Sequence, residues 1–191
     1  MGRLIYAALT SLDGYISDDT GNFDWAEPRE DVHSFINRLE QENGTAILGR
    51  EMYSIMSFWE DMPGIEKQPE YLREYQVAWK NLKKIVISRS LNEIKTENTT
   101  LKRELDRGAL EKLKRTEKKN IGIGGASIAS QVLAYGLMDE IYRFIFPIMV
   151  GSGKKWLTNS GVVRFDLIGT HEFAGGVVML HYKIDTGVQR W

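Results

Sequence analysis

Residues 120–127 read Asn-Ile-Gly-Ile-Gly-Gly-Ala-Ser, and residues 128–133 continue as Ile-Ala-Ser-Gln-Val-Leu. A brief apolar strand that ends in adjacent glycines and opens into a helix leaves backbone N–H groups free at the helix's positive end, with no Cβ to block a phosphate. The third glycine of the doubly wound dinucleotide fingerprint is missing, because Ser127 stands there, and the turn lies two-thirds along the chain. Two interpretations follow: a phosphate cradle outside that fold, or a tight structural turn.

Strand-like and helix-like segments alternate around this turn. The apolar patterns predict buried strands at residues 4–10, 45–48, 84–88, 98–101, 120–123 and 139–148. Helical spacing and stop signals predict helices at residues 30–39, 51–58, 71–79, 107–116 and 127–135. Gly175 and Gly176 separate two further strand-like runs, which is a hairpin signal. The chain is therefore expected to form one domain over residues 1–191, with a mixed α/β sheet covered by helices on both faces.

The composition is that of a globular domain, with 42% hydrophobic and 27% charged residues among 191. A net charge of −1 gives no general field that would attract nucleic acid or an anionic membrane. Cysteine is absent, and the three histidines lack the spacing of a metal site, so no metal is expected. The longest apolar run, residues 144–150, is too short to span a bilayer, and no leader precedes the first strand. We expect a soluble cytoplasmic protein.

Three of the predicted strands end in turns of similar design. Gly49-Arg50 follows the second strand, Ser88-Arg89-Ser90 ends the third, and the glycine turn at 124–127 follows a later one. The carboxyl ends of parallel strands meet at one edge, where ligands collect in open α/β sheets. Glycine turns offer backbone donors to a pyrophosphate, while arginine and serine suit a terminal phosphomonoester. Each turn alone could be an ordinary helix start or surface loop, but together they favour a phosphorylated dinucleotide.

The order of short motifs along nearly the whole chain resembles a known superfamily. The motifs are Ser-Leu-Asp-Gly at 11–14, Ile-Leu-Gly-Arg-Glu-Met-Tyr at 47–53, Val-Ile-Ser-Arg-Ser at 86–90, Gly-Gly-Ala at 124–126, Leu-Met-Asp-Glu at 137–140 and Pro-Ile-Met-Val-Gly-Ser-Gly at 147–153. In this order they resemble the dihydrofolate reductase-like superfamily. More narrowly, the chain is similar to the reductase domain of bacterial riboflavin-biosynthesis deaminase-reductases and its stand-alone relatives.

This resemblance implies a three-layer α/β fold, in which a mostly parallel sheet of about eight strands ends in an antiparallel C-terminal strand. It also implies NADPH as the cofactor and a homodimer as the assembly. The residues expected near NADPH are Gly49 and Arg50 at the adenylate phosphates; Ser88, Arg89 and Ser90 around the 2′-phosphate; Gly124, Gly125, Ala126, Ser127 and Ile128 at the pyrophosphate; Ala8, Thr10, Asp13 and Ile16 near the nicotinamide; and Gly21 to Trp25 in an adjoining mobile loop.

Met52 is a departure from the family pattern. Relatives often carry threonine or serine there, and the hydroxyl can reach a phosphate. Methionine in this chain loses that expected contact, although the position still belongs to the implied cofactor site.

Three carboxylates are candidates for a catalytic role. Glu30 lies two residues beyond Pro28, like the carboxylate that holds the pterin in dihydrofolate reductases, and Asp31 follows it directly. Such a group can hold an amino-heterocycle and assist its protonation. Acids at a helix start are also favoured by capping and by the helix dipole alone. Asp13 precedes a glycine, so it is either a site residue or part of an ordinary turn.

The function that we predict is an NADPH-dependent reductase of a small heterocycle or a carbonyl or imine compound. By resemblance, a 5-amino-6-(5-phosphoribosylamino)uracil reductase-like activity is one candidate, and reduction of dihydrofolate or another pterin is an alternative. An NADPH-binding regulatory protein without turnover is an alternative of another class. A domain without any cofactor is the remaining possibility.

Overall fold

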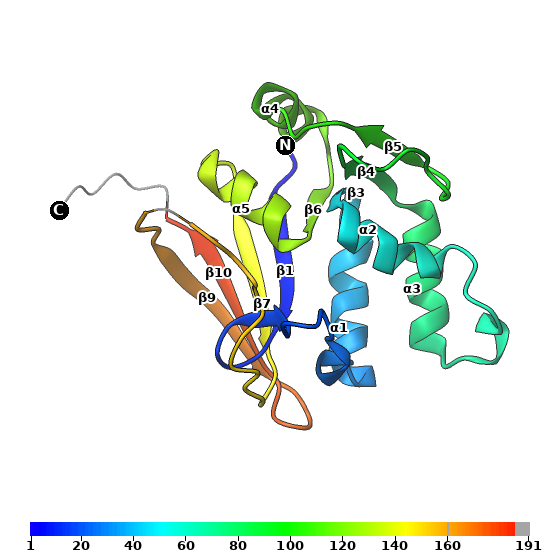
Figure 1. The fold of residues 1–191 in the computed structure, drawn as a ribbon, viewed down its shortest axis with the longest axis vertical. Helices are drawn as coiled ribbons and strands as arrows, with labels where there is room; N and C mark the ends of the chain where they lie inside the picture. Colours follow the sequence, from blue (N-terminus) through cyan, green and yellow to red (C-terminus); the bar gives the residue numbers. More distant parts are fainter. Residues whose placement is uncertain (160, 186–191) are drawn as a thin grey trace.

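The computed structural model describes residues 1–159 and 161–185, so the end of the predicted domain range lies outside the described residues. An eight-stranded sheet forms the centre, in the order β5-β4-β3-β6-β1-β7-β10-β9 (Figure 1). Its strands are β1 (Leu4–Thr10), β3 (Asn43–Gly49), β4 (Lys83–Ile87), β5 (Thr99–Lys102), β6 (Asn120–Gly124), β7 (Glu140–Ile145), β9 (Phe165–Glu172) and β10 (Val178–Ile184). A separate two-stranded sheet joins β2 (Tyr15–Ser17) to β8 (Lys154–Lys155).

The sheet is mostly parallel. Each neighbouring pair from β5 to β7 is parallel, whereas β10 pairs antiparallel with β7 and again with β9. Strand β10 therefore opposes the other strands of this sheet, which confirms the predicted antiparallel C-terminal strand. Gly175 and Gly176 both have positive φ angles, 81° and 79°, in the tight connection between β9 and β10. The predicted hairpin is confirmed as well.

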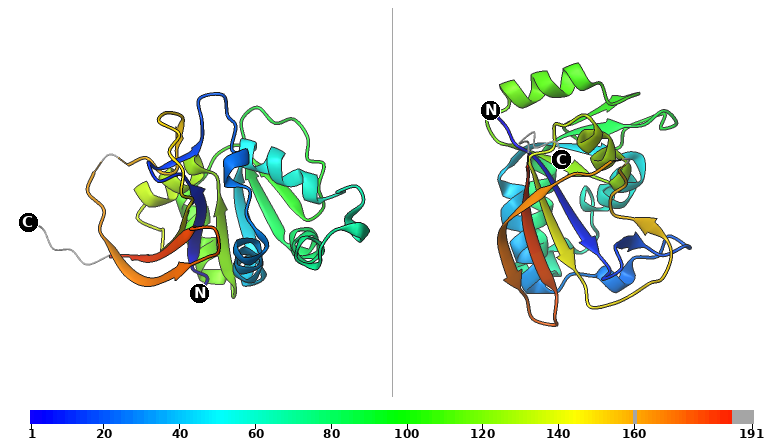
Figure 2. Two further views of the ribbon diagram at one scale, coloured as in Figure 1. Left: turned by 90° about the horizontal axis from the view of Figure 1, so that it is seen from below. Right: turned by 90° about the vertical axis from the view of Figure 1, so that its left-hand side faces the viewer.

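Helices cover both faces of the sheet, as the sequence predicts. The α-helices are α1 (Glu30–Gln41), α2 (Arg50–Met56), α3 (Glu70–Asn81), α4 (Arg107–Thr116) and α5 (Ala126–Ala134), and the short 3-10 turns are η1 (Asp24–Ala26), η2 (Ser57–Trp59) and η3 (Ile65–Lys67). Helices α1 and α3 pack side by side on one face, where Figure 2 shows them nearly end-on. Helices α4 and α5 contribute to the core of the opposite face through Leu110, Ile128 and Val132.

The alternation of side chains in β1 explains this layering. Leu4 and Tyr6 belong to the core cluster beneath α4 and α5, whereas Ala7 and Leu9 pack with the cluster beneath α1. Successive residues of a strand point to opposite faces, so a strand that is covered on both sides is apolar at nearly every position. The continuous apolar run at the N-terminus of the sequence thus specifies a central, doubly covered strand.

Some predicted boundaries differ from the structure. Strand β3 begins at Asn43, two residues before the strand predicted at 45–48, and β2 and η1 lie between β1 and α1, where no strand or helix is predicted. The strand predicted to reach residue 148 ends at Ile145. Pro147 lies just beyond that end, and proline has no N–H with which to continue a strand ladder.

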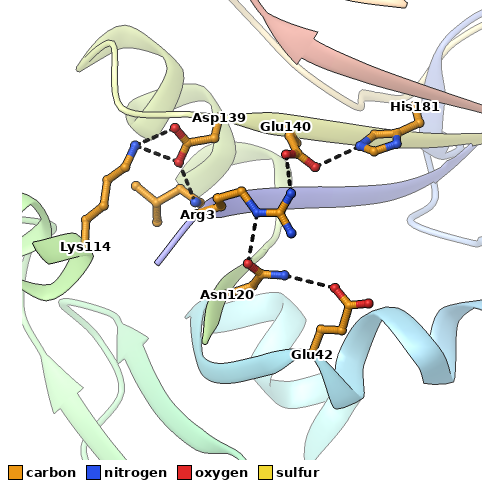
Figure 3. Close-up of polar contacts among 8 residues, drawn as sticks. Arg3, Glu42, Lys114, Asn120, Asp139, Glu140 and His181 are labelled. Atoms are coloured by element: carbon orange, nitrogen blue, oxygen red, sulfur yellow. Dashed lines mark hydrogen bonds and ion pairs between the residues drawn. The ribbon is translucent and has the colours of Figure 1, made fainter. Parts of the chain in front are cut away.

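Polar side chains tie the amino ends of the central strands together, at the opposite edge from the predicted ligand site (Figure 3). The guanidinium of Arg3 donates to Glu140 Oε1 at 2.7 Å and to Asn120 Oδ1 at 3.2 Å. His181 Nε2 lies 2.9 Å from the second oxygen of Glu140. Because the Glu140 side chain is only 8% exposed, these two partners supply the hydrogen bonds that a buried carboxylate requires.

His33 on α1 makes the stability of the protein depend on pH. Its buried ring packs against Tyr71 and Tyr75, and its Nδ1 lies 2.9 Å from Asn37 Oδ1. Burial lowers the pKa of His33 below the ordinary histidine value near 6.5. The unfolded chain therefore takes up a proton before the folded one, and the free energy of unfolding falls as the pH drops below about 6.5.

We expect urea titrations of the wild type to show this loss between pH 7 and pH 5. His33→Gln should be less stable at pH 7 and should have a flatter profile over the same range. A slope unchanged by His33→Gln would assign the pH dependence to other groups.

Candidate functional site

A cleft of about 2310 Å³ runs along the central strands, and its lining extends from Asn43 and Asn120 at their amino ends to the turns beyond their carboxyl ends. The three strand-end turns singled out in the sequence all line it, through Gly49 and Arg50, Ser88 to Ser90, and Gly124 to Ile128. Ala8, Ile16, Gly21 and Met52 line the same cleft. The fold thus brings together segments that lie up to 120 positions apart in the chain, counted from Ala8 to Ile128.

The glycine turn after β6 lies close to the turn at Gly49. Gly125 precedes α5 with a φ of 99°, and no side chain caps that helix, so the N–H groups of its first turn lack intrahelical acceptors. A Cβ on Gly125 would lie 3.8 Å from the backbone nitrogen of Gly49, which shows how closely the two turns approach. Met52 packs against the same place, 3.6 Å from that Cβ position. The turn therefore offers backbone donors that a small anion could reach.

The turn after β4 has a second support that the sequence did not reveal. Ser88 Oγ accepts the N–H groups of Ser90 and Leu91 at 3.3 and 2.9 Å. Arg103, which follows β5, donates to the carbonyls of Ser88, Arg89 and Leu91, the last at 2.6 Å. Arg103 thus fixes the backbone of the turn, and the exposed side chain of Arg89 remains at the rim of the cleft.

Thr10 and Trp25 do not line the cleft. Thr10 is fully buried, and its hydroxyl oxygen accepts a hydrogen bond from Arg143 Nε at 3.0 Å. Trp25 packs edge-on against Phe146, and its buried Nε1 has no hydrogen-bond partner among the described residues. Their predicted contacts with a cofactor stay predictions.

A flap formed by residues 15–24 and 150–156 borders the cleft; Figure 2 shows these two segments, blue and yellow, beyond the end of β1. Strand β2 pairs with β8, and the carboxylate of Asp19 accepts a hydrogen bond from Ser152. Lys154 in β8 reaches across to form an ion pair with Glu51 in α2. Neither the strand pairing nor this ion pair was predicted, because the partners are separated by more than 100 residues of sequence.

None of the three predicted catalytic carboxylates lines the cleft. Asp13 accepts the N–H groups of Gly151 and Val150 at 2.7 and 3.3 Å, and a hydrogen bond from Ser11 lowers its pKa below the ordinary range. Asp31 accepts the N–H of Ala174 at 2.8 Å and so ties α1 to the β9–β10 hairpin. Glu30 is exposed at the start of α1. The geometry accounts for Asp13 and Asp31 as structural groups, and a catalytic role for any of the three stays a prediction.

Comparison with known proteins places the chain in a family. The RibD C-terminal domain matches residues 3–179. The chain belongs to the RibD C-terminal domain family. This RibD-type domain is reductase-like, and the narrower resemblance stated from the motifs is confirmed. Among curated relatives, YyaP of Bacillus subtilis (strain 168), an uncharacterized protein, is 28% identical over 188 residues, which cover 94% of each chain.

Solved structures share the fold of the RibD-type domain. A protein of Shewanella sp. PV-4 named after riboflavin biosynthesis has a TM-score of 0.76 at 21% identity, with 96% of this chain and 99% of that one covered. Dihydrofolate reductase from Enterococcus faecalis, complexed with NADP(H) and RAB-propyl, has a TM-score of 0.64 at 15% identity, with 96% of both chains covered. At these identities the likeness establishes the fold, which is the predicted dihydrofolate reductase-like one.

Proposed function

We propose that this RibD-type domain is an NADPH-dependent reductase of a small heterocycle or a carbonyl or imine compound. One observation carries the proposal: three strand-end turns, each with a composition suited to phosphate, line one cleft together with Ala8 of β1 and Ile16 of β2. A dinucleotide needs such a row of sites, because its phosphates are spread along an extended molecule. The structurally similar dihydrofolate reductase that is complexed with NADP(H) supports this choice of cofactor.

The residues present fit this cofactor. The uncapped first turn of α5 and the turn at Gly49 would hold the pyrophosphate, and Arg89 with Ser88 and Ser90 would hold the 2′-phosphate. The Ser88 oxygen already accepts two N–H groups, so its O–H is left to donate to a phosphate oxygen. When bound, NADPH supplies the hydride. The chain's own residues would orient the cofactor along the cleft, and the flap that borders it would shield the bound cofactor from water.

Arg89→Ala tests the proposal. Because an arginine–phosphate pair is charge-assisted, its loss should raise the Kd for NADPH about thirtyfold and leave the Kd for NADH within about twofold. Isothermal titration and thermal shift with both cofactors measure this. Arg115→Ala is the matched control, since Arg115 is exposed on α4 and does not line the cleft. Equal effects of Arg89→Ala on NADPH and NADH would contradict the 2′-phosphate assignment.

A second candidate is an NADPH-binding protein without turnover. It is motivated by the positions of Asp13, Glu30 and Asp31, because none of these three predicted proton donors lines the cleft, although other carboxylates such as Asp24 and Glu27 do. Stoichiometric NADPH binding with no oxidation at 340 nm across pterins, folates and aminopyrimidine ribose phosphates would support it. If the protein instead oxidises NADPH in the presence of one of these compounds, that compound shows whether the substrate is of the riboflavin type or the pterin type.

The homodimer remains a proposal, which sedimentation of the purified chain would test. No helix among the described residues is long and apolar enough to cross a membrane.

A further inference from the structure

The lysine and arginine side chains that line the cleft differ in the groups that they contact. Arg103 is bound to three backbone carbonyls, and Arg50 and Arg89 lie on the turns already considered. Lys154 is the remaining lysine or arginine among the described lining residues, and it is paired with a carboxylate, that of Glu51. Lys154 therefore already contacts an anion, and another anion can take the place of the Glu51 carboxylate.

Lys154 and Glu51 come from opposite sides of the cleft. Lys154 belongs to β8 of the flap, where it pairs with Ser17 of β2, whereas Glu51 is two residues beyond Gly49. Gly49 in turn approaches the Gly125 turn, and both residues of the ion pair line the same cleft as these two turns. A cation and a set of N–H groups therefore border one cleft.

The position of Lys154 is fixed by the backbone of the flap. A Cβ on Gly153 would lie 2.1 Å from the carbonyl oxygen of Ser17, so the two segments are in direct backbone contact just before Lys154. The neighbouring Lys155 does not line the cleft, as expected for the next residue of a strand, whose side chain points to the opposite face. The flap thus directs one of two adjacent lysines toward α2.

We propose that Lys154 binds the pyrophosphate of the cofactor and that Glu51 holds this lysine in place until the cofactor arrives. The inference rests on the proposed function. The carboxylate of Glu51 accepts the hydrogen bond from Lys154 in the free protein, and an incoming phosphate oxygen replaces it as the acceptor. The exposed lysine–carboxylate pair is weak and costs little to open, and the pyrophosphate carries more negative charge than the single Glu51 carboxylate, so the exchange is favourable.

Two variants are expected to change binding in opposite directions. Lys154→Met should raise the Kd for NADPH about tenfold, because a charge-assisted hydrogen bond to phosphate is lost. Glu51→Gln should lower that Kd about threefold, since it removes both the competitor for Lys154 and a negative charge near the phosphates. The pyrophosphate is common to NADPH and NADH, so both cofactors should respond alike, in contrast to Arg89→Ala.

The decisive measurement is Lys154→Met made in the Glu51→Gln background. If Lys154 binds phosphate, its loss weakens NADPH binding about tenfold in this background too, where the Glu51 carboxylate is already absent. If Lys154 serves only to neutralise Glu51, the double variant binds like Glu51→Gln alone, and the inference is overturned. Lys155→Met is the matched control and should leave the Kd within about twofold of the wild type.

Calorimetric titration of each variant with NADPH and with NADH gives these constants, and melting without cofactor checks that each variant is folded. Failure of the wild type to bind either cofactor would overturn the proposed function and this inference together. Binding by the wild type with no change in Lys154→Met would overturn the inference alone.

Discussion

Replacing Gly153 by alanine should destabilise the flap by about 3 kcal/mol and weaken NADPH binding about tenfold. Gly153 has a φ of 139°, and a Cβ there would lie 2.1 Å from the Ser17 oxygen and 2.7 Å from the Asp18 Cα. Both obstructing atoms belong to the backbone, so no side-chain rotation relieves the clash. Strands β2 and β8 must separate, and Lys154 then loses its position opposite Glu51.

Gly151→Ala is the control for this experiment. Gly151 also has a positive φ, 80°, but a Cβ there would meet nothing within 4 Å. Gly151→Ala should therefore lose only the free energy needed to place alanine at a positive φ, about 1 kcal/mol, and residue 151 should keep its N–H bond to Asp13. Denaturant titration and cofactor binding measure both variants. If the two variants behave alike, the backbone contact between the flap segments does not hold the cleft together.

The fold could be predicted from the sequence to the extent that its signals are local. The strand of residues 4–10 and the helix of residues 107–116 have the predicted boundaries, because apolar periodicity and capping act over a few residues. Strand order could be predicted only through the family resemblance. The placement of β6 between β3 and β1 depends on pairings such as Leu4 with Ile121, which no local pattern encodes.

The candidate site, like the fold, could be predicted from the sequence only in part. The turns at Gly49, Ser88 and Gly125 were recognisable because each is a strand end with a distinctive composition, and all three line the cleft. Arg103 and Lys154 were missed, since each acts on a segment far away in sequence and neither lies in a recognisable motif. Asp13 and Asp31 drew attention as acids near turns, and the structure shows backbone N–H groups as their partners. Carboxylates favoured by turn and helix-start chemistry are weak evidence of catalysis.

Phe144→Ala is expected to have the largest effect on global stability, about 4 kcal/mol. Phe144 is fully buried in β7, and its ring lies 5.9 Å from that of Phe35 in α1 and 6.0 Å from that of Phe173. Truncation removes buried apolar area and leaves a cavity between β7, α1 and the connection from β9 to β10. For a chain of this length the melting temperature should fall by about 10 °C.

Phe58→Ala is the matched control, because Phe58 is 54% exposed and should cost less than about 1 kcal/mol. The cavity would open on the face covered by α1, whereas the glycine turn packs through Ile128 into the cluster beneath α5. Below the melting transition, Phe144→Ala should therefore bind NADPH within about threefold of the wild type. A much larger loss of binding would mean that the two faces of the sheet are coupled, and that the cleft depends on the packing of α1 as well as on the turns that line it.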